Sequence, residues 1–151
     1  MIGQLIHDLK YHSVRALAHP LAEILNTTLP PTKTPSIIVP LPTIGHHIRE
    51  RGFDHTQLIA KSFTKLRSNC TLQNLLTRNH NTVQVGSNRS TRLAQASSAY
   101  TLTQNVIIHP NLTYILFDDV WTTGASMQSA YSLLKNAGAQ HIIIAILALS
   151  Q

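Results

Sequence analysis

The sequence predicts one α/β domain in which a parallel sheet is flanked by helices. Short apolar runs at 36–39, 113–117 and 141–149 are bounded by proline, glycine or polar residues, a pattern typical of buried strands. The intervening segments place apolar residues at helical spacing, and strands that alternate with helices favour a parallel sheet. The 151 residues, 43% of them hydrophobic, are enough for one core and too few for two ordinary domains.

The N-terminal segment, residues 1–30, is predicted to be helical and to pack on a domain formed by 31–151. Apolar positions across 2–25 follow helical spacing, so we expect one interrupted helix or two short helices. Ser13 would cap the second helix, although Pro20 then falls inside it, and a kink or a start near Pro20 fits equally well. A Thr- and Pro-rich connection leads from this segment into the first strand.

The middle of the chain is predicted to alternate between strand, loop and helix. The strand at 36–39 is followed by prolines, and 43–53 is loop-like in composition. Apolar residues across 56–66 keep helical spacing, with Asp54 as the predicted N-cap. A further strand is expected around 72–76.

The C-terminal half contains a long polar loop and the remaining strands. Residues 79–98 are rich in Asn, Ser and Thr, and loops of this length in a small domain are usually lids or disordered segments. The strand at 113–117 is followed by a helix over 125–137, which Gly138 ends, and by a last strand at 141–149.

Composition excludes several classes of protein. Cys70 is the only cysteine, which excludes a disulfide framework and a CxxC zinc site and indicates a reducing compartment. The longest apolar run, 142–149, is far shorter than the roughly 20 residues that span a bilayer. Asp8 and Lys10 interrupt the N-terminal stretch where a signal peptide would be apolar. We therefore expect a cytoplasmic protein with no membrane insertion.

The charge of the chain favours an anionic partner. Twelve Lys and Arg against six Asp and Glu give a formal net charge of +6, and no acid lies between Asp54 and Asp118. A solvated basic face explains such a run equally well. Aromatic residues make up only 5% of the chain, which argues against a stacking surface for single-stranded nucleic acid. The basic residues of the acid-free interval are Lys61, Lys65, Arg67, Arg78, Arg89 and Arg92.

The segment from Ile115 to Ser126 carries the clearest chemical signal. Asp118 and Asp119 follow a buried strand, and a hydroxyl-rich turn containing Gly124 then opens a helix. Free N–H groups at a helix start bind phosphate, and carboxylates suit a sugar diol or a hydrated divalent cation. Two adjacent carboxylates repel by about 3 kcal/mol, which a ligand or cation would offset. The alternative is a turn that only caps its helix.

This segment resembles the phosphoribosyl pyrophosphate (PRPP) motif of type I phosphoribosyltransferases. Further stretches resemble the ComF branch, which is associated with DNA uptake in naturally competent bacteria, so the resemblance extends over nearly the whole chain. These stretches are Leu9 to Tyr11, Val39 to Pro42, Arg49 to Leu58, Gln84 to Gly86, Arg89 to Leu93, and Ala99 with Tyr100.

The resemblance implies a fold with a flexible hood loop and a role for each motif. Asp118 and Asp119 would be catalytic, contacting the ribose hydroxyls of PRPP and holding Mg²⁺ indirectly, through water or the ligand. The residues implied for the 5′-phosphate are Thr122, Thr123, Gly124, Ala125 and Ser126. Those implied for the pyrophosphate are Leu41, Pro42, Arg49 and Arg51. The hood, 79–98 with its flanks, would contribute Arg78, Gln84, Arg89 and Arg92.

The resemblance also implies partners, and the chain departs from its relatives in informative ways. Single-stranded DNA, a competence helicase and a second copy of the chain are the partners it suggests, and a PRPP-sensing regulator remains an alternative to an enzyme. Many ComF-like chains carry an N-terminal cysteine zinc module, and this sequence, with Cys70 as its single cysteine, contains no such motif. Thr122 stands where purine-base transferases place an aspartate, which weakens a purine-salvage interpretation. Trp121 is expected to pack under the turn rather than face an acceptor.

Overall fold

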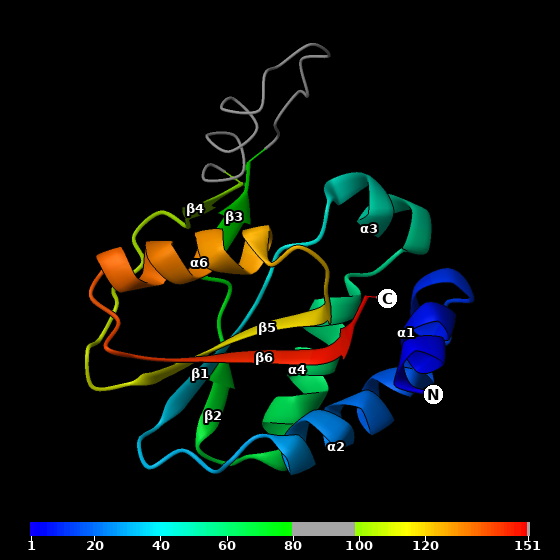
Figure 1. The fold of residues 1–151 in the computed structure, drawn as a ribbon, viewed down its shortest axis with the longest axis horizontal. Coiled ribbons are helices and arrows are strands. Elements are labelled where there is room, and N and C mark those ends of the chain that lie inside the picture. The colour runs from blue at the N-terminus through cyan, green and yellow to red at the C-terminus, as the bar shows by residue number, and fades with distance from the viewer. Residues whose placement is uncertain (80–98, 151) are drawn as a thin grey trace.

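Four parallel strands form the central sheet of the computed structural model, which describes residues 1–79 and 99–150 (Figure 1). The strand order is β2-β1-β5-β6, and each neighbouring pair is parallel. The carboxyl ends of β1 and β5 therefore lie at the same edge of the sheet. The strands are β1 (Ser36–Pro40), β2 (Cys70–Leu72), β5 (Thr113–Trp121) and β6 (His141–Leu149).

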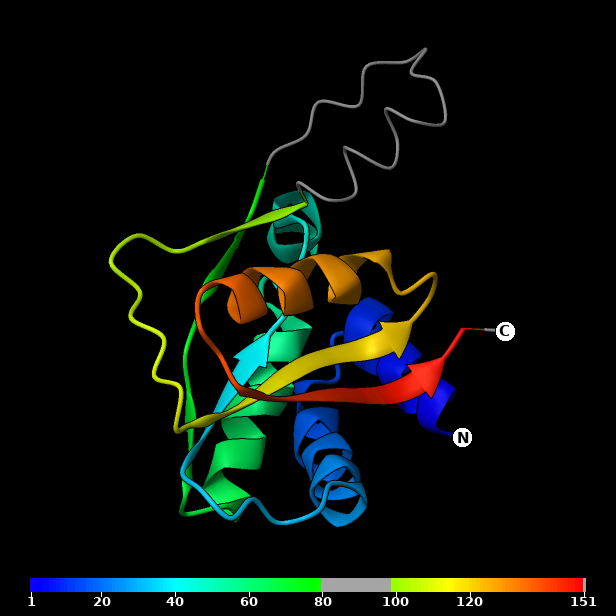
Figure 2. The ribbon, with the colours of Figure 1, turned by 60° about the vertical axis from the view of Figure 1, so that its left-hand side comes forward.

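Helices cover one face of this sheet and bury its first core. Leu9, Leu21 and Phe63 from three of these helices are fully buried against Ile38 of β1 and Ile115 of β5. Figure 2 shows α2 and α4 side by side on this face. The elements are α1 (Ile2–Tyr11), the 3-10 turn η1 (Arg15–Leu17), α2 (Ala18–Thr28) and α4 (His55–Leu66).

In the part of the chain that the structure describes, helix α6 and a small antiparallel pair of strands lie on the opposite face. Val39 and Leu116 point to this side because side chains alternate along a strand, and they pack on Leu134 of α6 (Ala125–Asn136). Strands β3 (Leu76–Arg78) and β4 (Tyr100–Leu102) form a separate antiparallel pair beside α6. The parallel sheet flanked by helices is thus confirmed.

Three predicted boundaries are corrected by the structure. Residues 43–53 are not all loop: Gly45–Arg51 forms helix α3, which has no buried residue and so no apolar periodicity to reveal it. The strand expected around 72–76 is wrong: residues 73–75 connect two strands, because β2 ends at Leu72 and β3 begins at Leu76 in the other sheet. Strand β5 runs on to Trp121 because β6 pairs with it that far.

The structure also shows how α2 begins and which residue caps α4. Ser13 adopts a left-handed φ of 54° between α1 and η1 and does not cap α2, while Pro20 lies in the first turn of that helix, where proline is tolerated. Asp54 caps α4 as predicted, accepting from the backbone N–H groups of Thr56 and Gln57.

Residues 80–98 of the predicted hood lie outside the described residues. Among the helices of the described ranges, none is both long and apolar enough to span a bilayer.

Candidate functional site

A pocket of about 270 Å³ opens at the edge where β1 and β5 end. Its walls come from the end of α1, the loop after β1, helices α3 and α4, strand β5 and the start of α6. Because parallel strands end at the same edge, this is where an open α/β sheet binds ligands. The side chains that line it include both Asp118 and Asp119.

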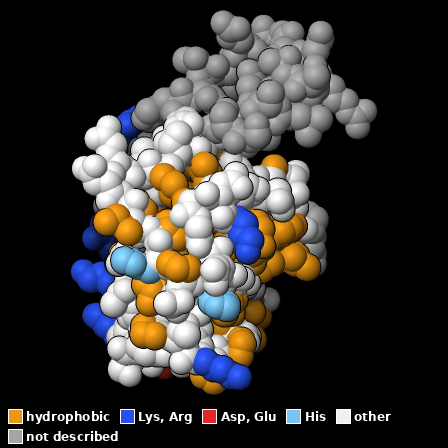
Figure 3. All heavy atoms as spheres, turned by 90° about the vertical axis from the view of Figure 1, so that its left-hand side faces the viewer, with side chains coloured by type: hydrophobic (Ala, Val, Ile, Leu, Met, Phe, Trp, Pro, Cys, Tyr) orange, Lys and Arg blue, Asp and Glu red, His pale blue; other side chains and the backbone are white. Residues whose placement is uncertain are grey.

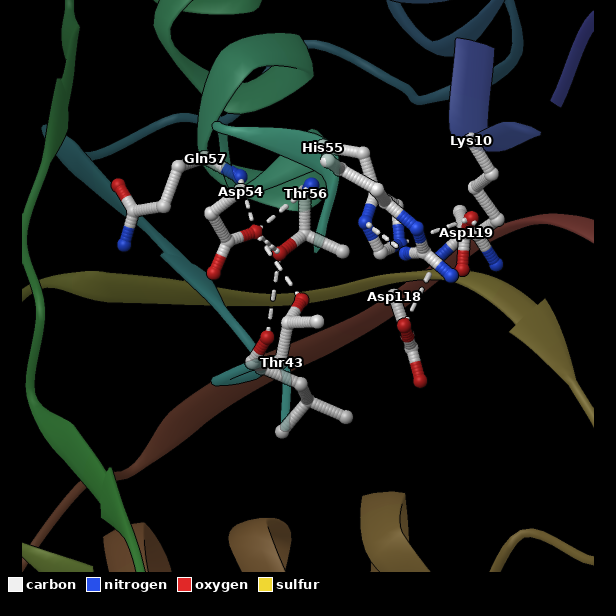
Figure 4. Close-up of polar contacts among 10 residues, drawn as sticks. Lys10, Thr43, Asp54, His55, Thr56, Gln57, Asp118 and Asp119 are labelled. Carbon is white, nitrogen blue, oxygen red and sulfur yellow. Dashed lines mark hydrogen bonds and ion pairs between the residues drawn. The ribbon is translucent and has the colours of Figure 1, made fainter. Parts of the chain in front are cut away.

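The two aspartates face opposite sides of the sheet. Ile115 and Phe117 pack on the helices α2 and α4, whereas Tyr114 and Leu116 pack under α6. The same alternation sends Asp119 toward α1 and α4 and Asp118 toward α6, as Figure 4 shows. Adjacent in sequence, the carboxylates therefore meet different surroundings.

Asp119 is buried among cationic and donor groups. Only 3% of the residue is exposed, and its Oδ2 lies 2.6 Å from Lys10 Nζ and 3.2 Å from His55 Nε2. Burial alone would raise the pKa of Asp119, but the hydrogen bond from His55 and the charges beside it outweigh burial and lower the pKa to about 2. Asp119 is therefore an ionised carboxylate held inside the protein.

His55 connects Asp119 to Arg51. Its Nε2 lies 3.2 Å from Asp119 Oδ2, and its Nδ1 lies 3.3 Å from Arg51 Nη1. A guanidinium can only donate hydrogen bonds, so Nδ1 is the acceptor in the contact with Arg51. The ring thus bridges the guanidinium and the buried carboxylate.

Asp118 has the opposite electrostatic character. Its Oδ1 accepts one hydrogen bond, from the backbone N–H of Asp119 at 2.9 Å. Burial, and then the negative charge of Asp119, raise the pKa of Asp118 to about 7. Both carboxyls line the pocket, but Asp119 Oδ2 is already in contact with Lys10 and His55, so Asp118 is the carboxyl that a ligand or cation would meet.

The turn between β5 and α6 depends on Gly124 and Trp121. Gly124 has φ +76° at the N-cap of α6, where no side chain caps the helix. A Cβ there would lie 2.4 Å from Trp121 Cζ2, so the indole packs directly against the turn, as predicted. Only glycine adopts this positive φ readily and also leaves room for the Trp121 ring to pack so closely. The start of α6 is thus left open to an external acceptor.

The predicted phosphate residues are divided between the pocket and its rim. Thr122 and Ser126 line the pocket. Gly124 lines an adjoining hollow of about 40 Å³ that shares Asp118, Thr122 and Ser126 with it. Thr123 and Ala125 are exposed and do not line the pocket; the Thr123 hydroxyl accepts from Ala125 N–H at 3.4 Å.

The loop after β1 is fixed from behind by α4. Leu41 donates its N–H to the Phe117 carbonyl and accepts from the Thr56 hydroxyl. Thr43 donates its hydroxyl to Asp54 Oδ1 at 3.1 Å, the same oxygen that caps α4 (Figure 4). The cap thus also shapes the loop in which Leu41 and Pro42 line the pocket.

The predicted arginines separate into those in the pocket and those outside it. Arg51 lines the pocket, and Arg49 is exposed on α3 and does not. Arg78 also lines it, with Nη1 2.9 Å from the Tyr100 hydroxyl and 3.4 Å from the Pro42 carbonyl. The other hood residues, Gln84, Arg89 and Arg92, lie outside the described residues.

Lys10, Tyr11 and Tyr100 are among the pocket residues to which the sequence assigned no role. Lys10 and Tyr11 come from α1, and their only signal was the resemblance of the segment around them to a family linker. Tyr100 is buried at the base of the hairpin, where burial raises the pKa of its hydroxyl. No local spacing connects these residues with Asp119, because the sheet brings them together.

The family of the chain follows from its match to known sequences. A model described as the phosphoribosyl transferase domain matches residues 48–150, which is more than half of the chain. The chain belongs to the phosphoribosyltransferase family.

A curated relative supports the ComF resemblance. The chain is 28% identical over 113 residues to Competence protein F of Haemophilus influenzae, an alignment that covers 73% of this chain and 48% of the relative. The chain therefore spans about half the length of that protein. The phosphoribosyltransferase family inferred from the motifs is confirmed, and the similarity to Competence protein F agrees with the ComF resemblance.

Solved structures show the same phosphoribosyltransferase fold at low sequence identity. The allosteric regulatory enzyme of purine biosynthesis superposes with a TM-score of 0.57 at 12% identity, over 89% of this chain and 26% of that one. Hypoxanthine phosphoribosyl transferase of Trypanosoma cruzi gives a TM-score of 0.51 at 12% identity, over 93% of this chain and 66% of that one. At such identities the likeness is one of fold.

Proposed function

We propose that the protein is a ComF-type phosphoribosyltransferase that binds PRPP with Mg²⁺. The observation that carries this proposal is the pocket where an open helix start, a pocket-facing carboxyl and two arginines converge. A ligand that bears a phosphate at one end, a diol in the middle and a pyrophosphate at the other would meet a suitable group at each part.

The 5′-phosphate is assigned to the start of α6. The helix is 12 residues long, its N-cap residue Gly124 has no side chain, and Thr123 accepts only from the Ala125 N–H, at 3.4 Å. Thr122 and Ser126, whose hydroxyls can add donors, line the pocket beside this helix start. Gly124 allows the backbone to approach an anion closely.

The pentose is assigned to Asp118 rather than to both aspartates. Asp118 lines the pocket, and its carboxylate oxygens accept hydrogen bonds from hydroxyl groups. Asp119 Oδ2 is already engaged by Lys10 and His55, so it supports the strand from inside.

The pyrophosphate is assigned to Arg51 and Arg78, together with the loop at Leu41 and Pro42. Both guanidinium groups line the pocket, and a guanidinium fork matches phosphate oxygens well. Arg78 takes the place that the motif resemblance gave to Arg49. Arg51 also hydrogen-bonds His55, which contacts Asp119. The group that would bind pyrophosphate is therefore connected to Asp119 through His55.

The residues present fit Mg²⁺. Asp118 offers hard oxygen donors beside hydroxyl groups, and Mg²⁺ commonly uses one or two carboxylates plus substrate phosphates. When bound, the ion would neutralise charge on the departing pyrophosphate. Asp118 would hold it through water or through the ligand, and ionisation of Asp118 favours that contact.

Transfer would proceed by attack of an acceptor on ribose C1 as pyrophosphate leaves. The protein's contribution is to orient the pentose at Asp118 and to stabilise the leaving group at Arg51 and Arg78. Thr122 cannot take a proton from a ring nitrogen, which argues against a purine acceptor.

Calorimetric titration with PRPP and Mg²⁺ tests the proposal. We expect wild type to bind, Asp118→Asn to lose at least about tenfold in affinity, and Glu23→Gln, which removes an exposed carboxylate on α2, to match wild type. Absence of heat from wild type, or full affinity in Asp118→Asn, would contradict the proposal. Pyrophosphate release with candidate acceptors then separates a transferase from a PRPP sensor that binds without turnover.

A second candidate is a DNA-uptake factor that contacts single-stranded DNA. The net charge of +6 and the acid-free interval between Asp54 and Asp118 favour it, and on the face in Figure 3 several Lys and Arg side chains are visible with almost no acidic ones. The name of the relative, a competence protein, agrees with such a role.

Salt dependence distinguishes this candidate from the first. DNA affinity that falls steeply with salt, survives Asp118→Asn and drops in Arg89→Ala with Arg92→Ala would support it. Affinity that ignores ionic strength would rule it out.

A further inference from the structure

Contacts between α1, α3, α4 and β5 close a ring in the wall of the pocket. Lys10 Nζ pairs with Asp119, and Asp119 accepts from His55. His55 accepts in turn from Arg51, whose guanidinium carbon lies 5.2 Å from the ring centroid of Tyr11. Tyr11 follows Lys10 in α1, so the ring returns to its start. Figure 4 shows Lys10 and His55 converging on Asp119 from two different helices.

Lys10 brings a full positive charge into direct contact with the buried carboxylate, 2.6 Å from Asp119 Oδ2. Its side chain is 18% exposed and that of Asp119 is 4% exposed. His55 makes the longer contact, at 3.2 Å, and also contacts Arg51. An ionised carboxylate left buried without a counter-charge is unfavourable, so without Lys10 it would rotate toward water. The nearest water-accessible space is the pocket, which Asp119 also borders.

We propose that Lys10 is a positioning residue for the ligand site and acts through Asp119. By holding Asp119 inside the protein, Lys10 leaves Asp118 as the ligand-facing carboxyl and fixes the strand that leads into the phosphate turn. Lys10 lies outside the matched domain, residues 48–150, so the proposal makes α1 part of the site. It rests on the proposed function for the identity of the ligand.

The alternative role for Lys10 is direct contact with a phosphate. Its ammonium group borders the pocket but lies 2.6 Å from Asp119, within the range of a strong charge-assisted hydrogen bond. A ligand would have to break that contact. The two roles predict different couplings between Lys10 and Asp119, which makes them separable.

Single variants give the first test. In calorimetric titrations with PRPP and Mg²⁺, at a temperature where every variant is folded, we expect Lys10→Met to bind about tenfold or more weakly. Lys10→Arg keeps the charge and should recover most of the affinity. Lys61→Met removes an exposed lysine of α4 and should bind as wild type does. Wild-type affinity in Lys10→Met would overturn the proposal.

A double-mutant cycle separates positioning from direct contact. If Lys10 acts through Asp119, adding Lys10→Met to Asp119→Asn should weaken binding by less than about threefold beyond Asp119→Asn alone. If the fold-losses of affinity in the two single variants multiply in the double variant, Lys10 contacts the ligand or acts elsewhere. That result would overturn the proposal. The double variant carries no unpaired buried charge, so it remains foldable if Lys10→Met alone does not.

Trp121 provides a measurement that needs no ligand. It is the single tryptophan, lies two residues after Asp119 and packs on Gly124. Release of Asp119 should loosen this turn and increase acrylamide quenching of the indole in Lys10→Met, with recovery in Lys10→Arg and no change in Lys61→Met. Quenching equal to wild type in Lys10→Met would overturn the proposal. If wild type bound no PRPP, the proposed function would fail, while this quenching would still decide the role of Lys10.

Discussion

Asp118 and Asp119 are adjacent and chemically identical, yet they occupy opposite kinds of environment. Asp119 lies against Lys10 and His55, and its pKa is lowered, whereas Asp118 lies in the pocket wall and its pKa is raised to about 7. Strand alternation produces the difference, because successive side chains point to opposite faces of a sheet. His55 and Lys10 stabilise the charge of Asp119, and that charge in turn helps to raise the pKa of Asp118. A paired acidic motif can thus contain one ligand-facing and one structural member.

Replacing each aspartate in turn by asparagine is the strongest test of the difference between them. Asp119→Asn leaves Lys10 without its buried partner and should lower the free energy of unfolding by about 3 kcal/mol. Asp118→Asn should leave it nearly unchanged at pH 6, because the carboxyl is largely neutral there. Urea denaturation followed by Trp121 fluorescence measures both. Equal losses would show that the two acids share one role.

The turn on the Asp118 side can be tested through its glycine. Gly124→Ala forces a left-handed φ on alanine and drives a Cβ into the Trp121 ring, so we expect a loss of about 2 kcal/mol in stability together with weakened PRPP binding. Gly138→Ala is a matched control, since Gly138 also has positive φ but nothing lies within 4 Å of its Cβ position. Thermal unfolding and calorimetry should show the larger effect for Gly124→Ala. Identical effects would mean that the contact with Trp121 contributes nothing.

Two arginines of α3 sharpen the comparison between pocket and surface. Arg51→Ala should weaken binding of PRPP with Mg²⁺ about tenfold, because it removes a pocket guanidinium. Arg49→Ala should have little effect, because Arg49 is exposed and does not line the pocket. Calorimetric titration distinguishes them. A larger loss in Arg49→Ala would restore the assignment implied by the motif.

The smallest expected effect is on the pH dependence of stability. The pKa of Asp118 is about 7 in the folded state and near 4 when unfolded, so its contribution to stability is fully present below pH 4 and is lost as pH rises through 7. Between pH 6 and 8 this change should lower stability by about 1 kcal/mol, or about 3 °C in Tm. Asp118→Asn should remove that slope in a thermal-unfolding series. A wild-type Tm that rises with pH in this range would contradict the raised pKa. PRPP affinity should change in the opposite direction and increase as Asp118 ionises.

The fold was largely predictable because its central strands, β1 and the first half of β5, are buried on both faces. Runs such as Ser36–Pro40 and Thr113–Trp121 are apolar without interruption at their centres, and the α4 cap at Asp54 has a local hydrogen-bond signature. Helix α3 was not predictable because none of its residues is buried. The split between β2 and β3 was also hidden, since which sheet a three-residue strand joins depends on distant partners.

The sequence by itself determined the strand, the pair of aspartates and the glycine turn into α6, because strand period, helix caps and glycine conformation act over a few residues. Only the tertiary structure decided that Lys10 and His55 bind Asp119, that Arg51 rather than Arg49 enters the pocket, and that Asp118 faces the ligand space. Those choices depend on which helices pack on which face of the sheet. Burial then sets how strongly each charge is felt, because it removes the water that would otherwise screen it.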